Sequence, residues 1–178
     1  MTKKISLDAV KALRENTGAS INACRIALES ASGDERKALE LLKQQGAVFA
    51  EKRQGRTAAQ GRAESYVHHD GRLAALVEVN CETDFVARTP EFSQFCKDVA
   101  MQVAAMGPRY VRREDASGDG SLSAEELKAL CLLEQPFVKD QSLSVGDLLK
   151  ALIAKTGENV VVRRMTRFAV GETAGASS

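Results

Sequence analysis

The chain has 178 residues, enough for one sizeable domain or for a small domain joined to a medium one. Its 25 Lys and Arg residues against 24 Asp and Glu give a formal net charge of +1, which offers no electrostatic case for binding nucleic acid or an anionic membrane. No apolar run approaches the ~20 residues that cross a bilayer, and residues 1–8 lack the apolar segment of a secretory signal. We therefore expect a cytoplasmic protein with no nucleic-acid or membrane partner.

The sequence offers no common catalytic or metal-binding pattern. Its four cysteines form no Cys-x-x-Cys pair, and its two histidines are the adjacent His68 and His69. It has no Walker A loop, no Gly-x-Gly-x-x-Gly, no Gly-x-Ser-x-Gly and no His-Glu-x-x-His. We expect a binding protein rather than an enzyme, with no cofactor and no metal. The thiols, expected to be reduced and mostly buried, are Cys24, Cys81, Cys96 and Cys131.

Residues 1–46 predict a three-helix N-terminal module. Ser6, Ser20 and Asp34 each stand where they can cap a helix, and Gly46 is expected at the C′ position that ends the third. Such a module resembles ubiquitin-associated domains, which bind partners, and it buries little surface alone. Residues 47–63 lose large apolar side chains after Phe49 and predict a short helical continuation followed by an exposed linker.

Residues 64–170 predict an α+β core domain, a three-stranded antiparallel sheet packed with helices. Asp70-Gly71 lies between two apolar runs, which is typical of a β-hairpin. The second run, 73–79, is apolar on both faces, so it is either central in its sheet or covered on both sides. The β-branched residues of 159–170 predict the third strand. The small and polar residues 171–178 predict a disordered tail.

Helix signals alternate with these strands. Thr89 and Pro90 begin a helix that Gly107 ends. A second helix is expected over 123–135, stopped by proline, and a loop over 137–143. A third begins at the capping residue Ser144 and closes at Gly157.

Residues 115–126 match a twelve-residue EF-hand loop, with side-chain oxygens at positions 1, 3 and 5, glycine at 6 and glutamate at 12. The helix that should precede the loop would contain Gly107 and Pro108, and proline breaks helices. Ser123 and Glu126 also fit a helix capping box, which explains half of the pattern without calcium. A calcium-binding adaptor that uses this loop is the alternative functional hypothesis.

Residues 78–88 predict a turn from a strand to a helix, with Asp84 and Phe85 side by side. An aromatic on a loop held by rigid elements is a candidate contact point, because aromatics dominate interface energetics. Spacing alone favours the other interpretation, in which Phe85 folds into the core and Asp84 merely opens the turn.

Four segments resemble the bacterial translation elongation factor Ts family, and in particular its short members. The signature Glu-Val-Asn-Cys-Glu-Thr-Asp-Phe-Val-Ala-Arg at 78–88 is the most specific of them. The other three are 13–21, 132–137 and 155–164. A ubiquitin-associated-type module joined to an unrelated α+β domain is the remaining hypothesis.

The resemblance implies guanine-nucleotide exchange on elongation factor Tu, in its GDP-bound and nucleotide-free forms, without covalent chemistry. It implies that Asp84 and Phe85, flanked by Thr83 and Val86, enter the partner's nucleotide domain and disturb its Mg²⁺ site. In the N-terminal module the matching contact positions are Arg14, Ile21, Asn22 and Arg25, and Gly157 lies in another contact segment.

This sequence departs from the family's pattern at several positions. Many members have two apolar residues where this chain has Ile21-Asn22, and Lys is usual where it has Arg25. Thr156 replaces a commoner aliphatic residue, and the Gly-rich insert at 115–121 has no counterpart. Short members also imply a homodimer formed through the three-stranded sheet.

Overall fold

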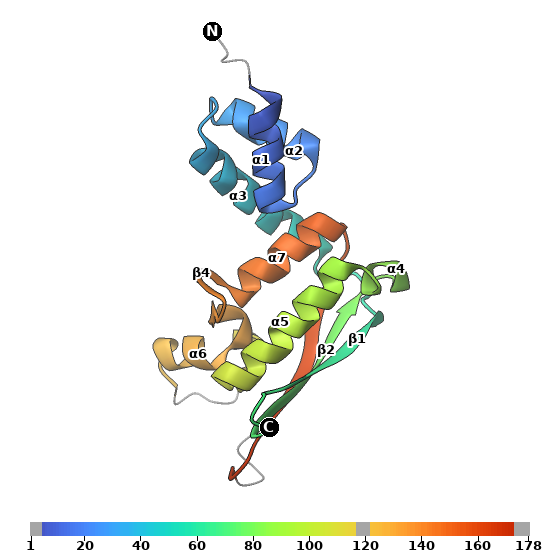
Figure 1. Cartoon of the computed structure of the whole chain (residues 1–178), viewed down its shortest axis with the longest axis vertical. Coiled ribbons are helices and arrows are strands. Elements are labelled where there is room, and N and C mark those ends of the chain that lie inside the picture. Colours follow the sequence, from blue (N-terminus) through green and yellow to red (C-terminus); the bar gives the residue numbers. More distant parts are fainter. Residues whose placement is uncertain (1–4, 117–121, 173–178) are drawn as a thin grey trace. The chain divides into compact units, whose positions relative to one another are not determined.

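The computed structural model describes residues 5–116 and 122–172 (Figure 1). The chain divides into two compact units. The first runs through Gly55 and includes Lys150–Gly157, and the second comprises Arg56–Leu149 with the chain after Gly157. Helix α7 (Val145–Thr156) therefore begins in the second unit and ends in the first. The arrangement is mixed α+β, as the sequence predicts.

Three helices build most of the first unit: α1 (Leu7–Thr17), α2 (Ile21–Ser30) and α3 (Glu35–Arg53). The predicted caps are confirmed, since side-chain oxygens of Ser6, Ser20 and Asp34 accept backbone N–H groups in the first turns. The core of this unit consists of small and medium apolar side chains, namely Val10, Leu13, Cys24, Ala27, Leu28, Ala31 and Ala38.

The prediction that Gly46 ends the third helix is wrong. Helix α3 continues through Gly46 to Arg53, where the guanidinium lies 4.9 Å from the ring centroid of Phe49. A Cβ added at Gly46 would lie 3.6 Å from Cβ of Ala154. Gly46 thus lies where helix α3 packs closely against the segment that contains Ala154. The sequence around a glycine does not show whether it ends a helix or allows such close packing.

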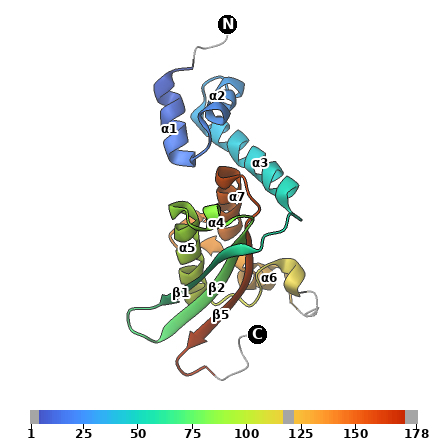
Figure 2. The same ribbon diagram turned by 90° about the vertical axis from the view of Figure 1, so that its right-hand side faces the viewer.

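The second unit contains the predicted three-stranded antiparallel sheet, with strand order β1-β2-β5 (Figures 1 and 2). The hairpin at Asp70-Gly71 is confirmed: Gly71 has φ +70°, and the Asp70 carboxylate accepts the backbone N–H of Arg72. Strand β1 starts earlier than the sequence predicts, within the expected linker. The strands are β1 (Gln60–Val67), β2 (Leu73–Cys81) and β5 (Val161–Ala169).

Helix α5 (Pro90–Met106) lies along one face of this sheet (Figures 1 and 2). As predicted, Thr89 caps it and Gly107 ends it. The opposite face of β2 is open, because Leu76 is 48% exposed. The apolar run of β2 therefore reflects its central position and not coverage on both sides. The buried residues between α5 and β2 are Ala75, Val77, Val79, Cys81, Phe92, Phe95, Cys96, Val99 and Val103.

Residues 122–144 differ from the prediction. Helix α6 (Ala124–Leu130) is shorter than expected, because Cys131 adopts an extended conformation and Leu132 is fully buried. The expected loop over 137–143 contains a small hairpin, β3 (Pro136–Phe137) with β4 (Asp140–Ser144). The Gln102 side chain of α5 holds this segment, donating to Gln135 and to the carbonyl of Pro136 and accepting from Val138 N–H. Two short 3₁₀ turns are Arg113–Ala116 and Leu132–Glu134.

Gly61 provides a test of the β1–β2 register. A Cβ there would lie 2.1 Å from the Val79 carbonyl oxygen, and Gly61 has φ +148°. We expect Gly61→Ala to lower the free energy of unfolding by about 3 kcal/mol or more. Gly71→Ala is the matched control, since Gly71 has φ +70° but nothing within 4 Å, and should lower it by about 1 to 2 kcal/mol. Urea unfolding measures both, and equal losses would contradict the assigned register.

Candidate functional site

The chain leaves the central strand of the sheet through a short, capped turn, residues 82–88, which we call the Phe85 turn. Strand β2 ends at Cys81, and the four-residue helix α4 (Asp84–Ala87) follows almost at once. Thr83 caps α4, since its Oγ1 accepts the N–H of Val86 at 3.3 Å. The next helix has its own cap at Thr89. This is the strand-to-helix turn that the sequence predicts.

Phe85 is exposed. Its side chain retains 80% of its accessible surface, so the interpretation that places this ring in the core is wrong. Asp84 is half-buried and pairs with Arg88 at 3.1 Å, one helical turn along. Val86 is also half-buried, and only Ala87 of α4 packs inward. The turn therefore presents a carboxylate and an aromatic ring on adjacent residues.

A buried thiol lies beneath this turn. Cys81 is fully buried, and its Sγ lies 3.1 Å from the carbonyl oxygen of Thr83. Burial raises the pKa of the Cys81 thiol to about 11 and that of Cys96 to about 12. All four cysteines are free and buried, in agreement with the prediction. Since the thiolate is the nucleophilic form, Cys81 and Cys96 are not poised for covalent chemistry.

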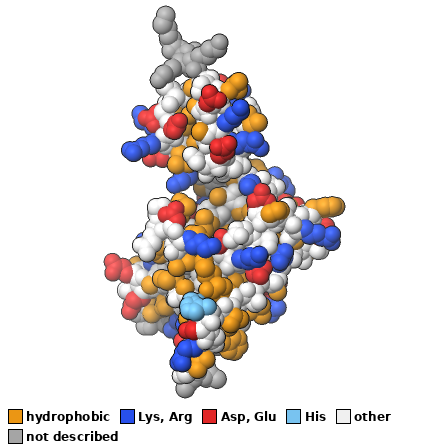
Figure 3. All heavy atoms as spheres, viewed as in Figure 1, with side chains coloured by type: hydrophobic (Ala, Val, Ile, Leu, Met, Phe, Trp, Pro, Cys, Tyr) orange, Lys and Arg blue, Asp and Glu red, His pale blue; other side chains and the backbone are white. Residues whose placement is uncertain are grey.

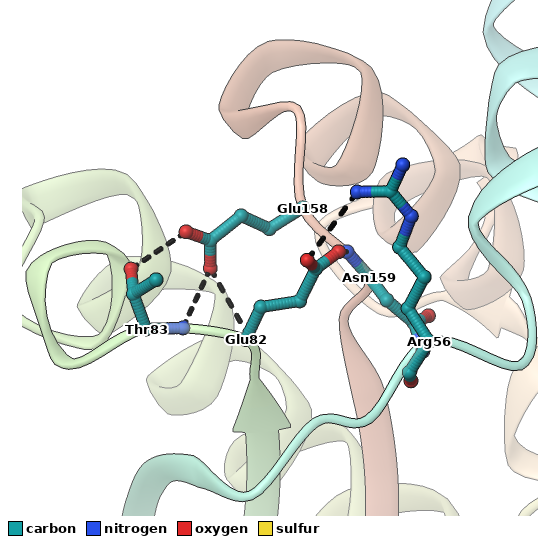
Figure 4. A network of polar contacts seen from close by, with 5 residues as sticks. All are labelled: Arg56, Glu82, Thr83, Glu158 and Asn159. Carbon is teal, nitrogen blue, oxygen red and sulfur yellow. Dashed lines mark hydrogen bonds and ion pairs between the residues drawn. The ribbon is translucent and has the colours of Figure 1, made fainter.

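Glu158 accepts three hydrogen bonds from the start of the Phe85 turn (Figure 4). Its Oε2 accepts the backbone N–H groups of Glu82 at 3.1 Å and of Thr83 at 3.0 Å. Its Oε1 accepts the Thr83 hydroxyl at 2.6 Å. A side chain just before strand β5 is thus bonded to the residues just after strand β2.

A second set of contacts runs beside the first (Figure 4). The Glu82 carboxylate accepts the Asn159 backbone N–H at 2.7 Å and lies 3.5 Å from the Arg56 guanidinium. The buried Asn159 side chain donates to the Arg56 carbonyl at 2.8 Å. Together with Thr83 and Glu158, these residues form the Glu158 network. The sequence analysis does not predict this network. The one feature of the sequence that points to it is the polar pair Glu158-Asn159 directly before an apolar strand.

The contact positions implied for the N-terminal module lie on α1 and α2. Arg14 is exposed in the last turn of α1, and Ile21 and Asn22 are exposed at the start of α2. The Arg25 guanidinium lies 3.1 Å from the Asn22 side-chain oxygen and 2.9 Å from the Glu29 carboxylate. These four residues are therefore accessible on neighbouring elements of one unit.

Gly157 ends helix α7 as predicted. Its φ is +76°, and its N–H donates to the Ile153 carbonyl at 2.9 Å. Two residues earlier, the Lys155 side chain packs against Gly18, in the turn between α1 and α2. Gly157 belongs to the same unit as the N-terminal positions, whereas residues 83–86 belong to the other unit.

The EF-hand-like segment is only partly described, because residues 117–121 lie outside the described residues. Of its end positions, the Asp115 carboxylate accepts the Arg112 N–H, and Glu126 forms the predicted capping box with Ser123. Within 5–116 and 122–172, no group of three or more His, Cys, Asp or Glu residues is arranged to hold a metal ion.

Two further surface properties bear on possible partners. On the face drawn in Figure 3, acidic and basic side chains are interspersed. Among the helices of the described residues, none combines the length and the apolar character that crossing a bilayer requires.

Comparison with known proteins places these features in context. A family model described as "Elongation factor TS" matches residues 5–126. "Elongation factor Ts" of Carboxydothermus hydrogenoformans is 45% identical over 94% of this chain and 90% of its own length. That of Thermotoga petrophila is 44% identical over 95% and 98%. That of Caldanaerobacter subterraneus subsp. tengcongensis is 43% identical over 94% and 98%.

The exposure of Phe85 predicts that its ring contributes little to folding. We expect Phe85→Ala to change the free energy of unfolding by no more than about 0.5 kcal/mol, as for surface substitutions. Phe92→Ala is the control, since Phe92 is fully buried in the same unit, and should lower it by about 3 to 5 kcal/mol. Denaturant unfolding of both variants measures these changes. A large loss of unfolding free energy for Phe85→Ala would show that the ring packs in the core.

Proposed function

This chain belongs to the elongation factor Ts family, and on that premise we propose that it is a cytoplasmic guanine-nucleotide exchange factor for elongation factor Tu. It binds the GDP complex of that partner, promotes GDP release and leaves the nucleotide site open to GTP. The step is an exchange of ligands, in which no covalent bond is made or broken, and it requires no cofactor of the factor's own.

The exposed Phe85 is the observation that supports this proposal most directly. A large aromatic that is 80% exposed gains free energy when a partner buries it, and such residues are typical interface hot spots. Helix α4 is capped by Thr83 and preceded by backbone groups bonded to Glu158. A ring presented from an ordered turn loses little conformational freedom on binding.

Asp84 and Phe85 act together on the partner. Phe85 enters the nucleotide domain as a wedge, while Asp84, with Thr83 and Val86 beside it, disturbs the groups that support Mg²⁺. Because Mg²⁺ bridges diphosphate oxygens to protein, loss of that support removes a large favourable charge interaction and weakens GDP binding. By thermodynamic linkage, GDP weakens the factor's binding to the same degree.

The N-terminal module supplies a second contact. Arg14, Ile21, Asn22 and Arg25 bind the partner's nucleotide domain through the accessible faces of α1 and α2. Ile21 is an exposed apolar side chain, while Asn22 is polar where many members are apolar, so this contact relies more on hydrogen bonding. Gly157 belongs to a further contact segment at the end of α7.

A homodimer forms through the open face of the sheet. Val67 and Phe168 lie on either side of Ala74 in register across the three strands, and they are 64% and 68% exposed. Leu76 lies two residues along the same face of the central strand. Exposed apolar side chains in one cross-strand row favour burial against a second copy. The nearby Glu78–Arg164 ion pair, at 2.6 Å, adds charged groups to this face.

The exchange role is tested by release of fluorescent GDP from elongation factor Tu. We expect the wild-type chain to accelerate release and Phe85→Ala to reduce the acceleration by about 30-fold or more, the size of one hot-spot side chain. Val138→Ala is a suitable control, because Val138 is exposed on the small β3–β4 hairpin, outside the proposed contacts. Lack of acceleration by wild type would rule out exchange, and acceleration only with Ca²⁺ would favour the calcium-binding alternative.

The homodimer is tested by light scattering. Phe168→Glu should convert the dimer to a monomer, because charge repulsion and desolvation oppose burial of that row. Val138→Glu is the control, since Val138 is exposed on the small β3–β4 hairpin of the same unit. A monomeric wild type at micromolar concentration would contradict the dimer.

A further inference from the structure

Glu158 is half-buried, and both of its carboxylate oxygens accept hydrogen bonds from the Phe85 turn (Figure 4). Three donors converge on it: the N–H groups of Glu82 and Thr83 at 3.1 and 3.0 Å, and the Thr83 hydroxyl at 2.6 Å. Hydrogen bonds to an ionised acceptor are about twice as strong as those between neutral groups. One side chain therefore fixes two consecutive peptide groups and the rotamer of Thr83.

The Thr83 hydroxyl connects this carboxylate to the short helix. Because its hydrogen points to Glu158, its lone pairs remain available to accept the Val86 N–H at 3.3 Å. The carboxylate thus orients the cap of α4 as well as the backbone before it. A chain of hydrogen bonds thus leads from Glu158 through the Thr83 hydroxyl to helix α4, which contains Asp84 and Phe85.

Several other hydrogen bonds of this turn are local: the Thr89 hydroxyl and N–H, for example, both donate to the Val86 carbonyl, at 2.8 and 3.0 Å. A four-residue helix is far too short to be stable alone. Phe85 adds little burial to hold it, since its ring is 80% exposed, and Ala87 is the one residue of α4 that is buried. Asp84 pairs with Arg88, which lies on the same turn. The orientation of Phe85 thus depends on polar contacts made to residues 82 and 83.

We propose that Glu158 is a positioning residue for nucleotide exchange, which holds the Phe85 turn in its binding conformation before the partner arrives. The inference rests on the proposed role of Phe85 in exchange. Glu158 itself need not touch elongation factor Tu. Without its charge, the turn samples other conformations, and part of the binding free energy must be used to order it.

The test compares Glu158→Gln and Thr83→Val with wild type in the GDP-release assay. Glutamine keeps the length of the side chain but provides one acceptor oxygen instead of two and no charge. Valine keeps the shape of threonine but removes the hydroxyl. Each variant should reduce the acceleration of GDP release roughly tenfold, the loss expected for hydrogen bonds to a charged group. Thr83→Ser, which restores the hydroxyl, should recover most of the rate.

Glu134→Gln is the matched control. Glu134 is also a half-exposed carboxylate of the second unit, and it pairs with Arg113 at 2.6 Å. Removing its charge weakens the interactions of another half-buried carboxylate without changing the Phe85 turn. Its exchange rate should equal that of wild type. A tenfold loss in this control would show that loss of charge at any half-buried carboxylate of the unit slows exchange and would overturn the specific role of Glu158.

A double-mutant cycle separates positioning from general stabilisation. If Glu158 acts through Phe85, Glu158→Gln should slow wild type tenfold but barely slow the Phe85→Ala variant. Equal losses in both backgrounds would overturn the proposal. Amide hydrogen exchange in the free full-length chain should also accelerate at Thr83 and Val86 in Glu158→Gln, while β2 stays protected; unchanged exchange there would overturn it too.

The outcomes distinguish this proposal from the proposed function. Normal exchange by Phe85→Ala would contradict the role of that ring, whatever Glu158 does. Slow exchange by Phe85→Ala with normal exchange by Glu158→Gln and Thr83→Val would leave the exchange role intact and reject the positioning role. If Glu158→Gln does not fold, Thr83→Val carries the test through amide hydrogen exchange at Val86 in the free chain, where no contact of Thr83 with the partner contributes; this exchange should accelerate, and unchanged exchange would overturn the proposal.

Discussion

The functional end of the second unit depends on how the backbone leaves strand β2. Where a central strand stops, its peptide groups lose their ladder partners while still half-buried, and an unpaired group there costs about 1 to 3 kcal/mol. The Glu158 carboxylate satisfies two such N–H groups at once, and Glu82 in turn accepts the N–H of Asn159 at the approach to β5. The segment after β2 and the segment before β5 thus supply hydrogen-bond partners for each other's backbone N–H groups. The exposed Phe85 turn begins at these reciprocal hydrogen bonds.

Most of the architecture follows from local chemistry visible in the sequence. Asp70-Gly71 fixes the hairpin, and Ser6, Ser20, Asp34 and Thr89 begin helices where capping rules place them. The errors arise where tertiary packing overrides local signals. Gly46 has the appearance of a helix stop but allows close packing. Residues 131–144 depart from helix and loop because Leu132 and the buried Gln102 side chain hold them against the core.

The candidate site was less predictable from residues alone. Hydrophobicity favours a buried Phe85, and only the resemblance to a known family indicates that it is exposed. Glu158 could not be assigned, because its partners lie 75 and 76 positions away in the sequence and a lone carboxylate before a strand is typical of a solvated position. Long-range pairing between the ends of two adjacent strands follows from sheet topology, which becomes clear only once β5 is placed next to β2.

The two threonine caps have a consequence for which changes the Phe85 turn can accept. Thr83 and Thr89 begin successive helices, so the segment between them has room for a single helical turn. Each inserted or deleted residue would rotate the downstream residues by about 100° around the helix axis and move either the ring or the second cap off its side. A change in the number of residues between the caps would therefore displace the Phe85 ring even if every side chain of the segment were kept. The number of residues between Thr83 and Thr89 therefore determines where the Phe85 ring points, and it is as much a part of the site as the ring itself.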